Sequence, residues 1–154
     1  MTCYHPITAF QTASGDVVFH ERARHGDSRQ IALPCGQCIG CKLERSRQWG
    51  IRCMHEAQMH DQNSFLTLTY NDENLPHRQQ LNHSDFQKFM KRLRKHVGVS
   101  TSISYYMGGE YGEQNWRPHF HACIFGWNPT DRKYFTRSPS GEKIYTSDTL
   151  QKIS

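Results

Sequence analysis

His119 and His121 flank the single apolar residue Phe120 in an alternating run at 119–125, which predicts a β-strand. Side chains of a strand point alternately to its two faces. Both imidazoles are therefore expected on one face, with Phe120 directed into a core. Two imidazoles held this close together can share one metal ion. The pattern thus predicts part of a metal site.

A carboxylate is available to complete this site. Glu110 precedes His119 by nine residues, after a predicted strand at 103–108 and within a glycine-rich hairpin connection at 108–115, and Glu113 is the competing carboxylate. Two imidazoles and one carboxylate leave positions open for water or a phosphate, so such a site can polarise a phosphodiester. Carboxylate favours Mg²⁺ or Mn²⁺, whereas imidazole also attracts Zn²⁺ or Ni²⁺. The alternative is a chance pairing among the ten histidines.

Three cysteines form a second constellation, because Cys35, Cys38 and Cys41 follow one another with two residues between each pair. Three thiolates at this spacing can surround one metal, and a tetrahedral zinc site would be completed by Cys3, His5 or Cys53. Iron–sulfur proteins use the same spacing, but no fourth cysteine followed by proline continues this run. The alternative is three reduced cysteines in a tight turn that precedes a helix.

Residues 84–97 predict the clearest helix, which Ser84 would cap and Gly98 would end. Its apolar positions form one stripe: Phe86, Phe89, Met90, Leu93 and Val97. Its outer face carries five cations, Lys88, Lys91, Arg92, Arg94 and Lys95, against one acid. These cations could bind nucleic-acid phosphates, although such a run is usually a solvated helix face.

Further nucleic-acid contacts are expected around the hairpin connection. Arg117 supplies a cation there, and stacking surfaces would come from Tyr105, Tyr106, Tyr111, Trp116 and Trp127. The same aromatic residues could equally belong to an ordinary core.

The remaining elements are expected as follows. Short strands are predicted at 7–10, 17–19 and 31–33, and a strand at 65–70 with Leu66, Leu68 and Tyr70 on one face. A helix is predicted at 41–60, and its apolar positions are Leu43, Gly50, Cys53 or Met54, and Ala57.

The segment 128–154 is polar and predicts a loop. Tyr134 and Tyr145 lie in it and are the candidates for a tyrosine nucleophile. Ser147 would begin a helix whose first apolar residues are Leu150 and Ile153. The chain ends inside this element, which predicts that it is a fragment of a longer protein.

Composition limits the class of protein. The chain has 154 residues, a net charge of 19 − 14 = +5, 36% hydrophobic and 12% aromatic residues, and a pI near 9.0. This length supports one domain, and the aromatic content argues against disorder. No apolar run approaches the ~18 residues of a membrane span. The mild basic excess favours an acidic partner such as nucleic acid.

Several of these segments resemble a known family. FLTLTY at 65–70 and RPHFHACIF at 117–125 are similar to two motifs of HUH endonucleases. The closer resemblance is to the replication initiation proteins of gokushoviruses, small single-stranded DNA phages of the Microviridae. It rests on CYHP at 3–6, LPCGQCIGCKLERSRQW at 33–49, FMKRLRK at 89–95 and GEYGE at 109–113.

The resemblance implies an enzyme of rolling-circle replication in the bacterial host cytoplasm. A divalent ion, Mg²⁺ or Mn²⁺, held by His119, His121 and Glu110 would polarise the scissile phosphate of single-stranded origin DNA. A tyrosine would become joined to the 5′ end, and the free 3′ end would serve the host replication machinery. The implied fold is α+β, a ferredoxin-like antiparallel sheet flanked by helices, with an N-terminal β and cysteine-rich extension.

One departure from the family concerns the tyrosine motif, which is expected beyond the position of Leu150. We therefore expect residues 1–154 to form a single domain that lacks the nucleophile. Its parts would be an N-terminal segment at 1–40, a metal- and DNA-binding core at 41–126 and an incomplete element at 127–154. The alternatives are a non-catalytic single-strand-binding module, zinc-stabilised through the cysteines, and an oxygenase using two histidines and a carboxylate.

Overall fold

The computed structural model describes residues 3–20 and 27–154 and divides the chain into two compact units, Met1–Arg52 and Cys53–Ser154. They are called here the N-terminal unit and the C-terminal unit. The predicted single domain with parts at 1–40, 41–126 and 127–154 stays a prediction. Among the described residues, no helix is long and apolar enough to cross a membrane.

The N-terminal unit contains one antiparallel sheet in the order β2-β1-β3. The strands are β1 (Ile7–Thr12), β2 (Val17–Val18) and β3 (Ser28–Leu33), as the sequence predicts to within a few residues. Gly15, with φ +92°, forms the tight turn between the first two strands. Within its described residues, only Ala9 and Gly40 are buried. This sheet therefore has very little apolar core.

Helix α1 (Ile39–Gln58) follows, close to the predicted range of 41–60. Its apolar face was predicted only in part. Cys53 and Ala57 are half-buried, but Leu43 and Met54 are exposed by 62% and 63%. In the second half of the helix the half-buried Glu56 bonds His60 through its carboxylate, and the His60 ring stacks on Phe125.

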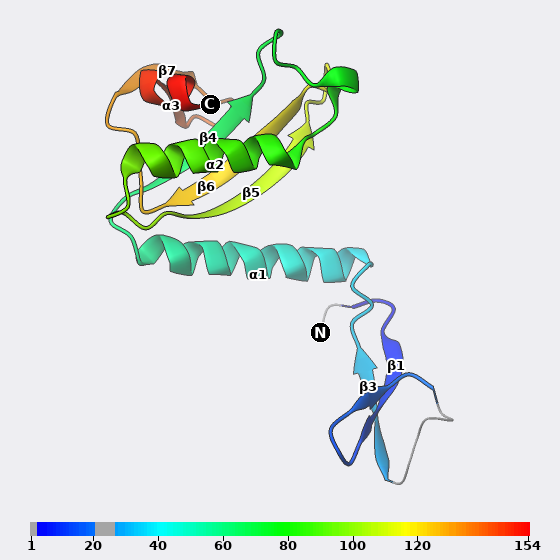
Figure 1. The fold of residues 1–154 in the computed structure, drawn as a ribbon. Coiled ribbons are helices and arrows are strands. Elements are labelled where there is room, and N and C mark those ends of the chain that lie inside the picture. Colours follow the sequence, from blue (N-terminus) through cyan, green and yellow to red (C-terminus); the bar gives the residue numbers. More distant parts are fainter. Residues whose placement is uncertain (1–2, 21–26) are drawn as a thin grey trace. The chain divides into compact units, whose positions relative to one another are not determined.

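The C-terminal unit is built on a second antiparallel sheet, in the order β4-β6-β5 (Figure 1). Its strands are β4 (Asn63–Thr69), β5 (Ser104–Tyr111) and β6 (Pro118–Phe125). The central strand β6 pairs with β5 along its whole length and with β4 from His119 to Phe125. Every second residue of β6 is therefore fixed on the same face of a rigid sheet.

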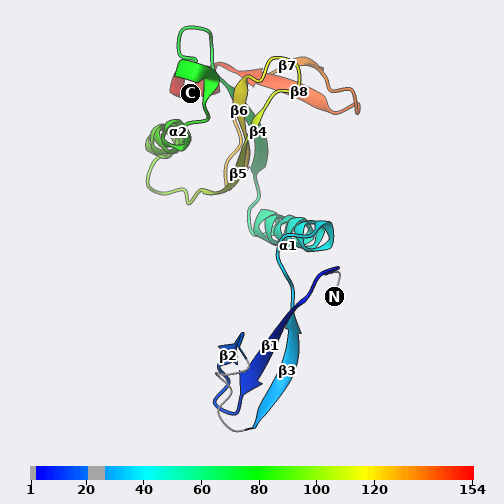
Figure 2. The same cartoon turned by 90° about the vertical axis from the view of Figure 1, so that its right-hand side faces the viewer.

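Helix α2 (His83–Val97) covers one face of this sheet, as the two views show (Figures 1 and 2). Its predicted stripe is confirmed, because Phe86, Phe89, Met90 and Leu93 are buried. They form one core with sheet residues Leu66, Phe120, Ala122 and Ile124. The sheet side chains on the face that points away from α2 are therefore available for other roles.

The ends of α2 are set by capping residues. The predicted N-cap, Ser84, is wrong: Asn82 caps the helix, and its Oδ1 accepts the backbone N–H of Ser84 at 3.1 Å. The Ser84 hydroxyl donates to the same oxygen at 2.9 Å, so it supports the cap. Gly98, with φ +89°, ends the helix as predicted.

The loop predicted between residue 128 and the helix start at Ser147 is wrong, because this part of the chain forms a hairpin. Strands β7 (Arg132–Arg137) and β8 (Lys143–Ser147) pair antiparallel and lead into α3 (Asp148–Ile153). The predicted helix start is confirmed, because Ser147 Oγ accepts the N–H of Leu150 at 3.1 Å. Every residue of β7 is exposed. No apolar alternation therefore marked the hairpin in the sequence.

These elements confirm an α+β fold in which antiparallel sheets are flanked by helices. A short 3₁₀ turn, η2 (His77–Gln79), lies between β4 and α2.

Candidate metal centre and nucleic-acid interface

The pairing of β5 with β6 brings Glu110 opposite His119. The sequence predicted a strand that ends at Gly108, with Glu110 in the glycine-rich hairpin connection that follows. The strand instead continues to Tyr111. A Cβ at Gly109 would lie 3.1 Å from the Leu81 side chain, so glycine there permits close packing rather than a turn. Glu110 is thus held by the sheet itself.

The three predicted ligands meet on the face of the sheet opposite α2. Glu110 Oε1 lies 2.9 Å from His119 Nε2 and 3.2 Å from His121 Nε2. One donor atom from each residue lies within 4.8 Å of the other two. The two imidazoles meet edge to face, with ring centroids 4.9 Å apart. Two nitrogens and one carboxylate oxygen at this spacing suit a divalent transition metal such as Mn²⁺.

Neighbouring groups orient both imidazoles. His119 Nδ1 lies 3.2 Å from the carbonyl oxygen of Arg117. Because a carbonyl only accepts, Nδ1 carries a proton that it donates to this oxygen, and Nε2 is the ring nitrogen that faces Glu110. His121 Nδ1 lies 3.1 Å from Thr67 Oγ1. Such outer contacts fix metal-binding imidazoles in other proteins.

Two further contacts shape the site. The exposed Phe65 ring stacks on His121 with 5.5 Å between centroids. Hydrogen bonding to His119 lowers the pKa of Glu110, which favours the ionised carboxylate. The competing carboxylate, Glu113, lies instead in a neighbouring groove. The geometry therefore favours Glu110 as the third ligand.

The predicted basic face of α2 lies on the other side of the sheet from these ligands. Three of its five cations have partners within the unit. Lys88 pairs with Asp85 at 3.2 Å, and Arg92 Nε donates to the Ile153 carbonyl at 2.6 Å. Arg94 donates to the Ile103 carbonyl at 3.3 Å and stacks over Tyr105. Lys91 and Lys95 are exposed. The binding of nucleic-acid phosphates by this face stays a prediction.

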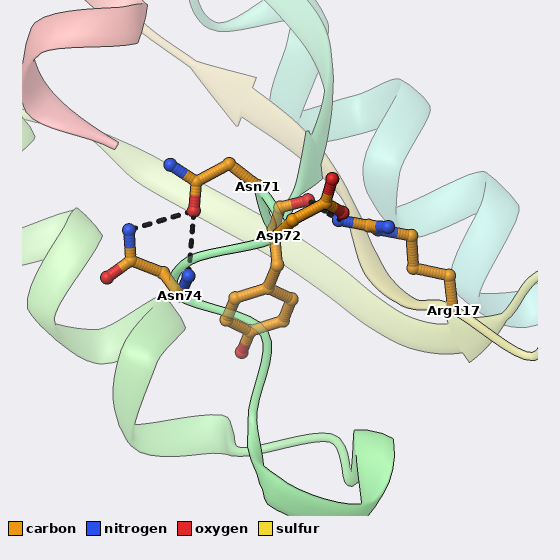
Figure 3. A network of polar contacts seen from close by, with 5 residues as sticks. Asn71, Asp72, Asn74 and Arg117 are labelled. Carbon is orange, nitrogen blue, oxygen red and sulfur yellow. Dashed lines mark hydrogen bonds and ion pairs between the residues drawn. The ribbon is translucent and has the colours of Figure 1, made fainter.

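A groove of about 420 Å³ runs beside His119 and is lined by Thr69, Glu113 and Arg117 among others. The guanidinium of Arg117 donates to the Tyr70 carbonyl at 2.8 Å and to Asp72 Oδ1 at 2.7 Å (Figure 3). It thereby fastens the chain leaving β4 to the start of β6. Arg117, which was predicted to contact DNA, therefore has a structural role at the rim of this groove.

The segment of chain that leaves β4 forms a turn. Two hydrogen bonds that Asn71 accepts from Asn74 hold this turn (Figure 3). The Asn74 backbone N–H and side-chain amide reach Asn71 Oδ1 at 2.9 and 2.8 Å. This loop therefore has side-chain support on both sides of Asp72.

A second groove, of about 480 Å³, is lined by Arg78, Gln79, Tyr111 and Trp116. The rings of Tyr111 and Trp116 lie 6.4 Å apart, and Trp116 is 71% exposed. The sequence pointed to both aromatics but missed Arg78, which adopts a left-handed φ of +60° in η2. Of the other predicted stacking residues, Trp127 packs against the core and Tyr105 against Phe86.

The two candidate nucleophiles lie in the β7–β8 hairpin. Tyr134 is paired with Tyr145 across the strands, and their rings meet edge to face with centroids 6.2 Å apart. Both are partly exposed, by 60% and 44%. Neither belongs to the group formed by Glu110, His119 and His121.

The predicted cysteine run forms a second group that could hold a metal. Cys3 joins Cys35, Cys38 and Cys41, with all four sulfurs within 4.8 Å of one another. Cys53, an alternative fourth ligand in the sequence, belongs to the C-terminal unit. A backbone N–H from Tyr4 lowers the pKa of the Cys38 thiol to about 6.

The sequence profile of the replication-associated protein ORF2 family matches residues 63–152. The match includes both histidines, Glu110 and helix α2. The chain belongs to the replication-associated protein ORF2 family. No solved structure matches this family member significantly.

Three curated phage proteins are similar to this member of the family. Replication-associated protein VP4 of Bdellovibrio phage phiMH2K is 38% identical over 99% of the chain and 50% of its own length. Replication-associated protein ORF2 of Spiroplasma virus 4 is 31% identical over 99% of the chain and 53% of its own length. Replication-associated protein ORF4 of Chlamydia phage 1 is 36% identical over 63% of the chain and 25% of its own length. The chain thus spans about half the length of the first two relatives.

Proposed function

We propose that this chain contains the metal- and DNA-binding part of a phage replication initiation protein that nicks single-stranded origin DNA. One observation carries the proposal: Glu110, His119 and His121 direct their donor atoms to one point on a rigid sheet. Membership of a family named for replication, and relatives in three phages, support it.

Glu110 Oε1 and the two Nε2 atoms would hold Mg²⁺ or Mn²⁺. When bound, the ion would draw electron density from a phosphodiester and so make its phosphorus more electrophilic. The chain's own residues supply alignment. The Arg117 carbonyl and Thr67 Oγ1 orient the imidazoles, so little rearrangement is needed when DNA arrives.

The two grooves indicate a path for the DNA strand. The loop between β5 and β6 contributes Glu113 and Arg117 to the groove beside His119, and it contributes Trp116 to the second groove. Exposed aromatic rings beside arginine are the surface on which unpaired bases stack. We infer that bases flanking the scissile phosphate stack on Trp116 and Tyr111.

The proposed reaction is transesterification. A tyrosine hydroxyl loses its proton and its oxygen attacks phosphorus; the bond from phosphorus to the 3′ oxygen breaks, and that oxygen takes up a proton. The products are a 5′-phosphotyrosine link and a free 3′-hydroxyl, from which host enzymes would extend DNA in the bacterial cytoplasm.

The test is metal-dependent binding of labelled single-stranded fragments that tile the genome encoding the chain. Fluorescence anisotropy should show at least tenfold tighter binding to one fragment with Mn²⁺ than with EDTA. His121→Ala should abolish this gain, and His83→Ala, which alters an exposed histidine at the start of α2, should keep it. Equal affinity with and without Mn²⁺ would favour the alternative, a non-catalytic single-strand-binding module.

A denaturing gel of the same mixtures identifies the nucleophile. A covalent adduct would show that a tyrosine within residues 1–154 attacks, and Tyr134→Phe and Tyr145→Phe would identify which. We expect neither substitution to change the gel, because these rings pack on each other rather than at the metal group.

A further inference from the structure

We propose that Cys3, Cys35, Cys38 and Cys41 bind one zinc ion that holds the N-terminal unit together in place of an apolar core. This site is separate from Glu110, His119 and His121, and the inference does not depend on the proposed function. It also identifies Cys3, rather than His5 or Cys53, as the fourth ligand of the cysteine site.

The sulfur positions fit one small ion. The distances between Sγ atoms are 3.6 Å for Cys3 and Cys35, 3.9 Å for Cys3 and Cys38, and 4.0 Å for Cys35 and Cys41. Four sulfurs placed tetrahedrally at about 2.3 Å from zinc would be about 3.8 Å apart. The four thiols already stand close to the corners of such a tetrahedron.

Backbone N–H groups support the sulfurs. Those of Cys38 and Cys41 each point to the Sγ three residues earlier, both at 3.4 Å. The N–H of Cys35 points to Cys3 Sγ at 3.3 Å and that of Tyr4 to Cys38 Sγ at 3.5 Å. Donors aimed at sulfur stabilise thiolates, the form that binds metal. They play the outer role that tunes metal ligands elsewhere.

The topology explains why these cysteines meet. Strands β1 and β3 pair with Ile7 opposite Leu33, so Cys3 before β1 lies beside Cys35 after β3. The chain then turns into α1, whose first turn contains Cys41. One ion bound here would join the start of β1 and the end of β3, which meet at one end of the ladder, to the start of the helix.

The N-terminal unit needs such a link. Ala9 and Gly40 are its only buried residues in the described part of the chain, whereas Ile7, Val17 and Phe19 are exposed by 45%, 42% and 56%. Units of this size without a core usually depend on disulfides or a metal. All six cysteines are free thiols, and the Sγ separations far exceed the ~2.05 Å of a disulfide.

Zinc fits this site better than an iron–sulfur cluster. A cluster contains several iron and sulfide ions between its thiolates, and four sulfurs that all lie within 4.8 Å of one another leave room for one ion. A single iron ion has the same geometry, and it would colour the protein.

Metal analysis of the full chain, purified without chelators, tests the proposal. We expect one zinc per chain, little iron and a colourless solution. Cys3→Ser and Cys38→Ser should each lower zinc content by at least tenfold. Two matched substitutions, Cys53→Ser and Cys123→Ser, remove cysteines outside the group and should leave zinc unchanged. The double variant His119→Ala and His121→Ala should also keep its zinc, which separates this site from the other metal group.

A second measurement uses the wild-type chain and so tests the proposal even if the cysteine variants fail to fold. X-ray absorption at the zinc edge of the wild-type chain should show four sulfur neighbours and no nitrogen. Replacement of zinc by Co²⁺ should give the intense visible bands of a tetrahedral thiolate site. Nitrogen or oxygen neighbours, full zinc content in Cys3→Ser, a coloured iron-containing protein, or cysteines paired as disulfides would each overturn the proposal.

Discussion

The N-terminal unit buries Ala9 and Gly40 among its described residues and gathers four thiols at one end of its sheet. The C-terminal unit packs α2 against a sheet through nine buried apolar residues, and its metal group lies on the opposite face. Among the residues that the structure describes, each unit thus has one group of side chains that could hold a metal. We infer that the cysteine group stabilises a unit that lacks an apolar core. The group of Glu110, His119 and His121 can serve a reaction instead, because the core of its unit already provides stability.

Removal of zinc should give the largest effect. It tests whether the N-terminal unit depends on a metal ion whereas the C-terminal unit depends on its core. Structural zinc in small domains supplies on the order of 10 kcal/mol of apparent folding energy. A strong chelator should therefore unfold the N-terminal unit and leave the C-terminal core intact. Two-dimensional NMR should show amide signals of β1 and β3 collapsing while those of β4 and β6 stay dispersed. Dispersed β1 signals after complete zinc removal would contradict the account.

Loss of core packing should affect the other unit. Leu93 is fully buried in α2, and Leu93→Ala should destabilise the C-terminal unit by ~3 kcal/mol. Leu43→Ala is the matched control in α1, since Leu43 is 62% exposed, and should cost less than ~0.5 kcal/mol. Urea unfolding followed by circular dichroism measures both. Equal losses would show that α2 packing does not dominate the stability of this unit.

Thr67 should affect the metal group and not the core. Thr67→Val removes the hydroxyl at His121 Nδ1 and should weaken Mn²⁺ binding about tenfold, at the low end for such outer contacts. Thr69→Val changes the next exposed threonine on the same face of β4 and should have little effect. Calorimetric titration with Mn²⁺ distinguishes them. Unchanged affinity in Thr67→Val would remove Thr67 from its positioning role.

The cap of α2 gives the smallest expected change. Asn82→Ala should destabilise the C-terminal unit by ~1 kcal/mol, because the Ser84 N–H loses its acceptor. Ser84→Ala should cost less, since that hydroxyl only donates to Asn82 Oδ1. A larger loss in Ser84→Ala, measured by urea unfolding, would restore the cap that the sequence predicted.

Much of the C-terminal unit could be predicted because its strongest patterns are periodic. The alternation in β4 and β6 and the helical stripe of α2 each have one apolar face, and the structure buries those faces. The β7–β8 hairpin lacked such a face. Its pairing depends on backbone hydrogen bonds and on Tyr134 meeting Tyr145, which a local pattern does not show.

The sequence could predict that the two histidines lie together, but it could not predict where helix α2 lies relative to them. His119 and His121 share a face because a strand alternates, which sequence spacing determines. That α2 packs on the opposite face depends on which side of the sheet Phe120 and Ile124 point to. The identity of Cys3 as fourth thiol depends on the β1–β3 register. Arg78 beside Trp116 depends on the fold of η2. All three features depend on contacts between residues that lie far apart in the sequence.

Calorimetric titration of the zinc-loaded chain with Mn²⁺ tests the central claim most directly. The account predicts one Mn²⁺ site per chain that disappears in His121→Ala and persists in His83→Ala, with an unchanged circular dichroism spectrum in both variants. Mn²⁺ binding of equal strength in His121→Ala would contradict it, because the ion would then not be held by Glu110, His119 and His121.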